Sequence, residues 1–131
     1  MDIKSFYIEL GRLAYAIARA DGIIQSEEVD RICDLIGQEI ENSGDDSFDK
    51  RDVILGAASE FNRLRTENAS ARQAFTGFTD FIAANTALFD SRTKNLCMKV
   101  ALRIADANEG VNETESALIN KLKQKLDAVS G

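Results

Sequence analysis

The chain has 131 residues, 44% of them hydrophobic and 29% charged, a profile typical of one globular domain spanning residues 1–131. The formal net charge of −6 argues against a nucleic-acid partner, and the absence of histidine excludes histidine-based acid–base catalysis and the commonest zinc ligand. The absence of proline favours long helices with short connections. Charged side chains near the N-terminus indicate neither a signal peptide nor a membrane span, so we expect a cytoplasmic protein without direct membrane insertion.

The first two helices are predicted from apolar side chains at helical spacing. Residues 3–20 form a wide apolar stripe, and Gly22 follows at a position that suits the left-handed backbone just beyond a helix C-terminus. Ser26 is placed to cap the second helix, and Glu27 and Glu28 suit its positive first turn. The predicted inward face of this second helix consists of Val29, Ile32, Cys33, Ile36 and Ile40.

The segment 41–52 breaks this pattern with Gly44, two serines and a run of acids. We interpret it as a solvated loop, with Ser47 or Asp49 capping a third helix. A fourth helix is predicted to start near Ser70, where polar residues again precede an apolar stripe. The inward face predicted for the third helix comprises Val53, Ile54, Ala57, Ala58, Phe61 and Leu64.

Two further helices are predicted in the last third of the chain. Asp90 or Ser91 is placed to cap the fifth helix, and Asn112 with Glu115 resembles a capping box at the start of the sixth. Their predicted inward residues are Leu96, Cys97, Val100, Ala101 and Ile104 in the fifth, and Leu118, Ile119, Leu122, Leu126 and Val129 in the sixth. No segment alternates like a strand, so the predicted architecture is an all-α bundle of about six helices.

Phenylalanines gather in and just beyond the fourth helix. Phe75, Phe78 and Phe81 recur at near-helical spacing, and Phe89 follows shortly after. One interpretation is a groove for a ligand or partner. The other is that these rings fill the centre of the core, which is favoured because aromatic stripes at helical spacing usually do so.

The two cysteines, Cys33 and Cys97, both fall within apolar helical stripes. They lack the paired spacing of a zinc ribbon or of a redox-active dithiol. We therefore interpret them as small core side chains rather than as metal ligands or reactive thiols.

A short motif occurs twice in the chain. The first motif copy, residues 18–28, reads ARADGIIQSEE, and the second motif copy, residues 105–115, reads ADANEGVNETE, 87 positions later. At this same offset Leu13 matches Val100, Ala14 matches Ala101, Ile17 matches Ile104, Ala18 matches Ala105, Ile24 matches Val111, and Ile32 matches Ile119. The repeat predicts two helix–turn–helix halves with matching faces, packed as a pseudo-symmetric pair with both turns at the same end of the molecule.

The first motif copy resembles the signature of TerB-like (tellurite-resistance) domains. Asp21, Gly22 and Glu28 match that signature, whereas in the second copy Asn108 replaces the aspartate and Glu115 is retained. The resemblance implies an all-helical fold of two pseudo-symmetric halves, with acidic residues on one surface that meet divalent cations. It also implies an association with tellurite and other chemical stress responses. Domains of this kind also occur fused to other modules, including a membrane-anchored DnaJ-type co-chaperone.

The acidic turn of the first motif copy is the candidate metal site. We expect Asp21, Glu28, Glu27 and Glu115 to provide oxygen ligands for Ca²⁺ or Mg²⁺, with waters completing a loosely bound coordination sphere. A cation would offset the repulsion, about 0.3–1 kcal/mol, between Asp21 and the C-terminal end of the preceding helix dipole. The structural alternative is that these carboxylates accept hydrogen bonds from the free amides of the next helix.

Two functions follow from these features. The first is a non-enzymatic TerB-like module of the stress response, whose acidic surface binds divalent cations weakly. The alternative is an adaptor without a metal role, which binds another protein through that surface or through a groove beside the phenylalanines. We do not expect an enzyme, because no nucleophile, histidine or phosphate-binding loop accompanies the paired carboxylates.

Overall fold

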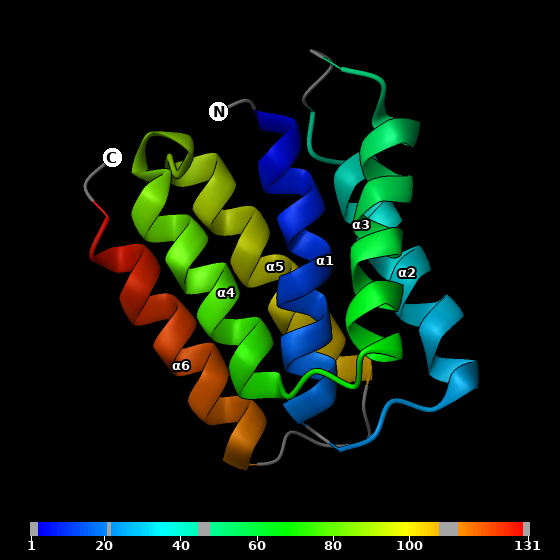
Figure 1. Cartoon of the computed structure of the whole chain (residues 1–131). Coiled ribbons are helices and arrows are strands. Elements are labelled where there is room, and N and C mark those ends of the chain that lie inside the picture. The colour runs from blue at the N-terminus through cyan, green and yellow to red at the C-terminus, as the bar shows by residue number, and fades with distance from the viewer. Residues whose placement is uncertain (1–2, 21, 45–47, 108–112, 130–131) are drawn as a thin grey trace.

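A computed structural model describes residues 3–20, 22–44, 48–107 and 113–129. Over these residues the chain forms six α-helices and one short 3-10 helix, and it forms no strand (Figure 1). The elements are α1 (Ile3–Ala20), α2 (Ser26–Glu41), α3 (Lys50–Thr66), α4 (Ala71–Ala84), η1 (Thr86–Leu88), α5 (Ser91–Ala107) and α6 (Glu113–Asp127). The predicted all-α architecture is confirmed.

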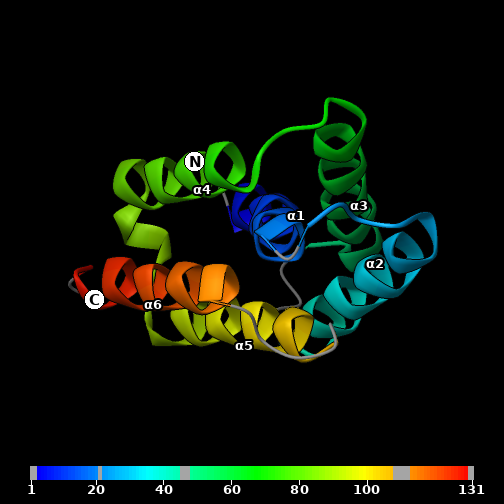
Figure 2. The same cartoon turned by 90° about the horizontal axis from the view of Figure 1, so that it is seen from below.

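Helix α1 lies at the centre of the bundle. Seen from below in Figure 2, α3 and α2 flank it on one side, and α4, α5 and α6 surround it on the other. It packs most extensively against α3, α4 and α5. A helix covered on several sides must be apolar around most of its circumference. Accordingly, α1 buries Phe6, Tyr7, Leu10, Gly11, Leu13, Ala14, Tyr15, Ala16, Ile17 and Ala18.

Gly11 sets the distance between α1 and α3. A Cβ atom at Gly11 would lie 2.9 Å from the carbonyl carbon of Ala57, and closer still to its carbonyl oxygen. Real Cβ atoms do not approach backbone atoms this closely. The absence of a side chain at Gly11 therefore allows the two helix backbones to meet, which brings Leu10 and Phe61 fully into the core.

The end of α3 has the hydrogen bonds of a Schellman motif. Asn68 adopts φ 55°, its N–H donates to the Arg65 carbonyl at 3.1 Å, and the Ala69 N–H donates to the Leu64 carbonyl at 3.0 Å. The Tyr15 hydroxyl donates to the Ala69 carbonyl at 2.7 Å, which ties this connection to α1. These bonds fix the point from which α4 starts.

Three helices begin with a side chain that accepts a hydrogen bond from a free amide. These bonds join Asp49 to the Arg51 amide, Ser70 to the Gln73 amide, and Asp90 to the Thr93 amide. The predicted caps Asp49 and Asp90 are confirmed, and so is the predicted start of a helix near Ser70, while Ser47 and Asn112 lie outside the described residues. Ser26 was wrongly predicted as a cap: it is the first residue of α2, and Gln25 occupies the N-cap position.

The phenylalanine cluster fills the upper part of the core, as its spacing predicts. Phe89 makes edge-to-face contacts with Phe6, Phe78 and Phe81, at ring-centroid distances of 5.5, 6.4 and 6.0 Å respectively. Phe78 and Phe89 are almost completely buried. Phe81 is partly buried against this core, and Phe75 is buried and also lines a surface groove described below.

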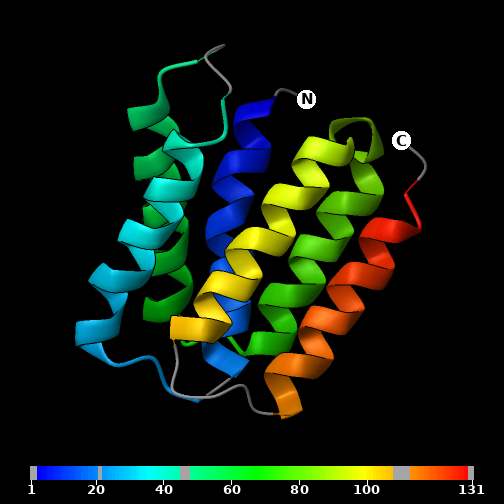
Figure 3. The same cartoon turned by 180° about the vertical axis from the view of Figure 1, so that it is seen from behind.

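The helix ends that flank the two motif copies lie at the same end of the bundle. Helices α1 and α5 finish, and α2 and α6 begin, at the lower end in Figure 1, and the reverse view in Figure 3 agrees. Gly22 in the first connection has φ 126°, as its place after the stripe predicts. None of the helices in the described ranges is both long enough and apolar enough to cross a membrane.

Candidate functional site

Glu28, one of the sequence-predicted site residues, caps helix α2. The Gln25 N–H donates to Glu28 Oε1 at 3.1 Å, and Arg31 Nη2 lies 4.0 Å from Glu28 Oε2. The Glu28 N–H in turn donates to the Gln25 carbonyl at 3.0 Å. These contacts are those of a capping box, in which an acidic side chain three residues after the N-cap satisfies a free amide.

The structure describes two of the other three predicted ligands, Glu27 and Glu115. Glu27 is exposed to solvent, Glu115 is fully buried in the first turn of α6, and Asp21 lies outside the described residues. Glu28 and Glu115 are brought to the same end of the bundle. Among the side chains that the structure describes, however, no group of three or more cysteine, aspartate or glutamate residues is placed to hold a metal ion.

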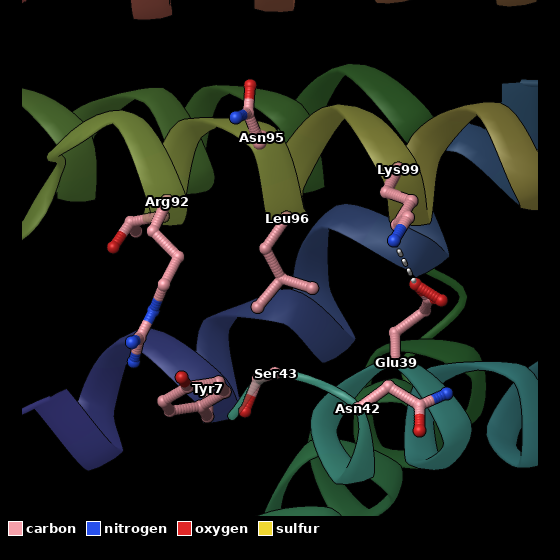
Figure 4. A pocket seen from close by; sticks show the side chains of 9 residues that line it. Tyr7, Glu39, Asn42, Ser43, Arg92, Asn95, Leu96 and Lys99 are labelled. Carbon is pink, nitrogen blue, oxygen red and sulfur yellow. Dashed lines mark ion pairs between the residues drawn. The ribbon is translucent and has the colours of Figure 1, made fainter. Parts of the chain in front are cut away.

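A polar pocket of about 180 Å³ lies between α1, α2 and α5 (Figure 4). Leu96 projects into its centre, Arg92 and Tyr7 lie at one end, and Lys99 faces Glu39 at the other. Its lining is completed by Asn42, Ser43, Thr93 and Asn95. The pocket thus combines an apolar centre with groups of both charges.

Glu39 is the buried charge of this pocket, with 4% of its surface exposed. Arg103 Nη1 donates to Glu39 Oε2 at 3.1 Å, and Lys99 Nζ lies 4.0 Å from Oε1. Breaking a buried ion pair on one side costs several kcal/mol, about 3–5 in measured cases. The Glu39 carboxylate therefore joins α2 to α5, and its charge is already compensated within the protein.

A second charged cluster joins α1 to α3. Glu60 accepts hydrogen bonds from Arg63 at 2.7 Å and from Arg12 at 2.9 Å, and these bonds lower the pKa of Glu60 despite its partial burial. Glu9 lies beside Arg12 at 3.3 Å, yet burial raises the pKa of Glu9 more than the arginine lowers it. Glu67 extends the cluster through Arg63 at 2.8 Å. Each carboxylate here has a cation beside it, as in a structural ion-pair network.

Neither thiol has the environment of a reactive cysteine. Burial raises the pKa of Cys97, which is fully enclosed in α5. The pKa of Cys33 is also raised, first by burial and then by the adjacent Asp30 and Asp34. Since the thiolate is the nucleophile and the metal ligand, both environments disfavour such chemistry.

A surface groove with a volume of about 630 Å³ lies between α4 and α6. Phe75 and Leu118 supply its apolar floor, and Thr76, Thr79, Thr114 and Ala117 line it further. Arg72, Lys121 and Lys125 form its edges. This groove lies beside the phenylalanine cluster, where the adaptor hypothesis expects a binding surface, but only Phe75 of the cluster lines it.

Sequence reasoning did not identify the basic edges of this groove or the buried Glu39. Glu39 stands three residues after Ile36 and directly before Ile40, which is the position of an inward-facing residue, and this was the available signal. The basic edges carry no such signal. Alternate lysines near the end of a helix are ordinary features of a solvated surface.

The fold and these surfaces define an all-α bundle with one polar pocket, one mixed apolar and basic groove, and an acidic helix start among its described parts. Comparisons with protein-family models, with curated proteins and with solved structures find no match to the chain. The TerB-like resemblance therefore rests on the motif residues and enters the functional argument as a proposal.

Proposed function

We propose that the chain is a non-enzymatic, TerB-like binding module that acts as an adaptor by holding another protein in the groove between α4 and α6. The observation that carries this proposal is the groove itself. Its volume of about 630 Å³ exceeds the volume of about 180 Å³ of the polar pocket, it has an apolar floor, and none of the described residues that line it is acidic. Apolar surface bordered by charge is typical of sites where proteins associate.

A non-enzymatic role is supported by the chemistry of the other surfaces. The polar pocket contains a carboxylate already paired with Arg103 and Lys99, and both cysteines have raised pKa values. A catalytic acid or base usually has a pKa shifted toward the pH at which the enzyme works, and it lies within hydrogen-bond distance of the group with which it exchanges a proton. Here the Glu39 carboxylate is held in ion pairs with Arg103 and Lys99, and the surroundings of both thiols disfavour the reactive thiolate.

The TerB-like assignment and the two pseudo-symmetric halves are supported by the burial of residues that match at the motif offset of 87 positions. Matching residues Leu13 and Val100, Ala14 and Ala101, Ile17 and Ile104, and Ala18 and Ala105 are all buried. With this assignment we propose a cytoplasmic role in the response to tellurite or other chemical stress.

Weak binding of Ca²⁺ or Mg²⁺ at the acidic turn is the second candidate function. It is favoured by the equivalent positions of Glu28 and Glu115, each the third residue of a helix that starts at the lower end of the bundle. Carboxylates are also found at helix starts because they cap the helix. The effect of a divalent ion on the melting temperature, described in the Discussion, distinguishes cation binding from capping.

The adaptor role is tested by site-specific photocrosslinking in cells that express the full chain. A benzophenone amino acid replaces Thr76, which lines the groove, and in a matched control it replaces Ser59, an exposed residue of α3 away from the groove. We expect a covalent adduct with another protein from position 76 and none from position 59, both with and without a chelator. Equal labelling from the two positions, or none from either, would refute the role.

A further inference from the structure

The groove between α4 and α6 is lined by side chains of two parallel helices. Both helices run upward in Figure 1 and lie side by side in Figures 1 and 3. Each contributes one stripe of residues at helical spacing: Arg72, Phe75, Thr76 and Thr79 from α4, and Thr114, Ala117, Leu118, Lys121 and Lys125 from α6. The α6 stripe extends over about 16 Å at 1.5 Å per residue, the length of about three helical turns.

The charge of the groove is opposite to the charge of the whole chain. The formal net charge is −6, yet Arg72, Lys121 and Lys125 border the groove and no acidic residue is among its described lining. These three cations form no ion pair with a described side chain, whereas Arg12, Arg63 and Arg103 elsewhere all do. Exposed cations beside apolar surface, left unpaired in an acidic protein, are available to a partner.

We propose that this groove binds an amphipathic helix of another protein whose apolar stripe is flanked by acidic side chains. The apolar stripe covers Phe75 and Leu118, and the flanking carboxylates meet Arg72, Lys121 and Lys125. The proposal rests on the proposed adaptor function and specifies the chemistry of its partner. A helix fits because the lining residues follow about three turns of α6 and are bordered by helices on both sides, and an acidic helix fits because of the charge of the edges.

A second copy of this chain does not present such a helix from its described residues. Its exposed large apolar side chains are spread over α1, the turn before α2, α3 and α5 rather than along one helix; they are Ile8, Ile23, Leu55 and Leu102. The acidic helix α2 has its apolar stripe buried against the rest of the bundle. The occupant is therefore expected to come from a different protein.

The test measures binding of a designed helical peptide to the full chain by fluorescence anisotropy. The probe is about four turns long, with leucine at i, i+3, i+4 and i+7 and glutamate on both sides of this stripe. A second peptide keeps the leucines and replaces every glutamate by lysine. We expect saturable binding of the glutamate peptide, and binding of the lysine peptide weaker by about tenfold or more, because like charges face each other across an interface.

Matched variants locate the site. Lys121→Glu combined with Lys125→Glu reverses two groove cations, and Lys123→Glu makes the same change on the same helix at a residue outside the groove lining. We expect the double variant to bind the glutamate peptide about tenfold more weakly, and the control to remain within about twofold of the parent. Circular dichroism of each variant verifies that the helices are intact.

Other outcomes would overturn the proposal. Equal affinity for the two peptides, or equal loss in the Lys123→Glu control, would show that the groove cations do not select the partner. Binding to anionic phospholipid vesicles that depends on Lys121 and Lys125, without peptide binding, would identify a membrane surface instead. Concentration-dependent dimerisation that blocks the groove would identify a second copy. If crosslinking from position 76 persists while the peptide fails to bind, the adaptor function stands and only the acidic helix is refuted.

Discussion

Replacing Gly11 by alanine is expected to destabilise the protein, although alanine is the better helix former. In a helix interior, glycine to alanine normally stabilises by about 0.5–1 kcal/mol, through helix propensity and a less flexible unfolded chain. At Gly11 the added Cβ would lie 2.9 Å from the Ala57 carbonyl carbon, and the neighbour is backbone that no rotamer change can move. Helices α1 and α3 must separate, and overpacking of this kind costs about 1–3 kcal/mol or more.

We therefore expect a net loss of about 2 kcal/mol in the free energy of unfolding of Gly11→Ala. For a chain of this length each kcal/mol lowers the melting temperature by about 3–5 °C, so the expected fall is about 6–10 °C. The measurement is thermal and urea unfolding followed by circular dichroism. The slope of the urea transition should stay close to that of the parent, since the change in exposed surface is small.

Gly37 provides the matched control. It lies inside α2, and a Cβ there would meet only the Ile54 side chain at 3.4 Å, an ordinary contact distance. Gly37→Ala should stabilise the protein by about 0.5–1 kcal/mol, the normal effect of this substitution in a helix. Opposite signs for the two variants would support the α1–α3 packing described above. If Gly11→Ala were as stable as the parent, the close approach of these two helices would be wrong.

Three further changes test other parts of the structure. Gly22→Val should destabilise by about 1 kcal/mol or more in thermal unfolding, because φ 126° is strained for a β-branched residue; an unchanged melting temperature would contradict this turn. Glu60→Gln should lower stability at neutral pH. Because Arg63 lowers the folded-state pKa of Glu60, the parent should lose stability as the pH falls below 4.5, and the variant should lose less. Equal loss of stability in the two proteins at acid pH would refute this role of Glu60. Saturating Ca²⁺ or Mg²⁺ in 0.15 M salt should raise the melting temperature modestly, an effect that Asp21→Asn with Glu28→Gln should abolish; an unchanged response would leave the turn as a helix cap only.

Most of the fold was predictable because the helices are bounded by strong local signals. The stripe from residue 3 to residue 20 coincides with the described α1, Asp49 and Asp90 were among the predicted caps, and a helix start was predicted near Ser70. These signals depend on side chains close in sequence, so they can be recognised without knowledge of the tertiary structure. The error at Ser26 has the same local origin, because a serine was preferred over Gln25 although Glu28 stands at capping-box spacing from Gln25.

The candidate site was less predictable because it depends on which helices are neighbours. Helical periodicity gives the inward face of α4 and of α6, but it does not place Arg72 opposite Lys121 across a groove. Helices so far apart in the chain become neighbours only through the packing of both against α1. Ion pairing of a lysine likewise depends on which residues surround it on the folded surface. Composition and residue spacing therefore do not predict it.

The separation of charge on this protein has a consequence for how a partner would be chosen. At physiological ionic strength charges interact over about 8 Å, so a partner far from the surface meets little of the net charge of −6. Close to the groove, the nearest charges are Arg72, Lys121 and Lys125, and these favour carboxylates. An acidic helix would therefore be repelled by the net charge of the chain and attracted at the groove. Repulsion elsewhere and attraction at the groove together give specificity, which neither the apolar floor nor the cations would provide alone.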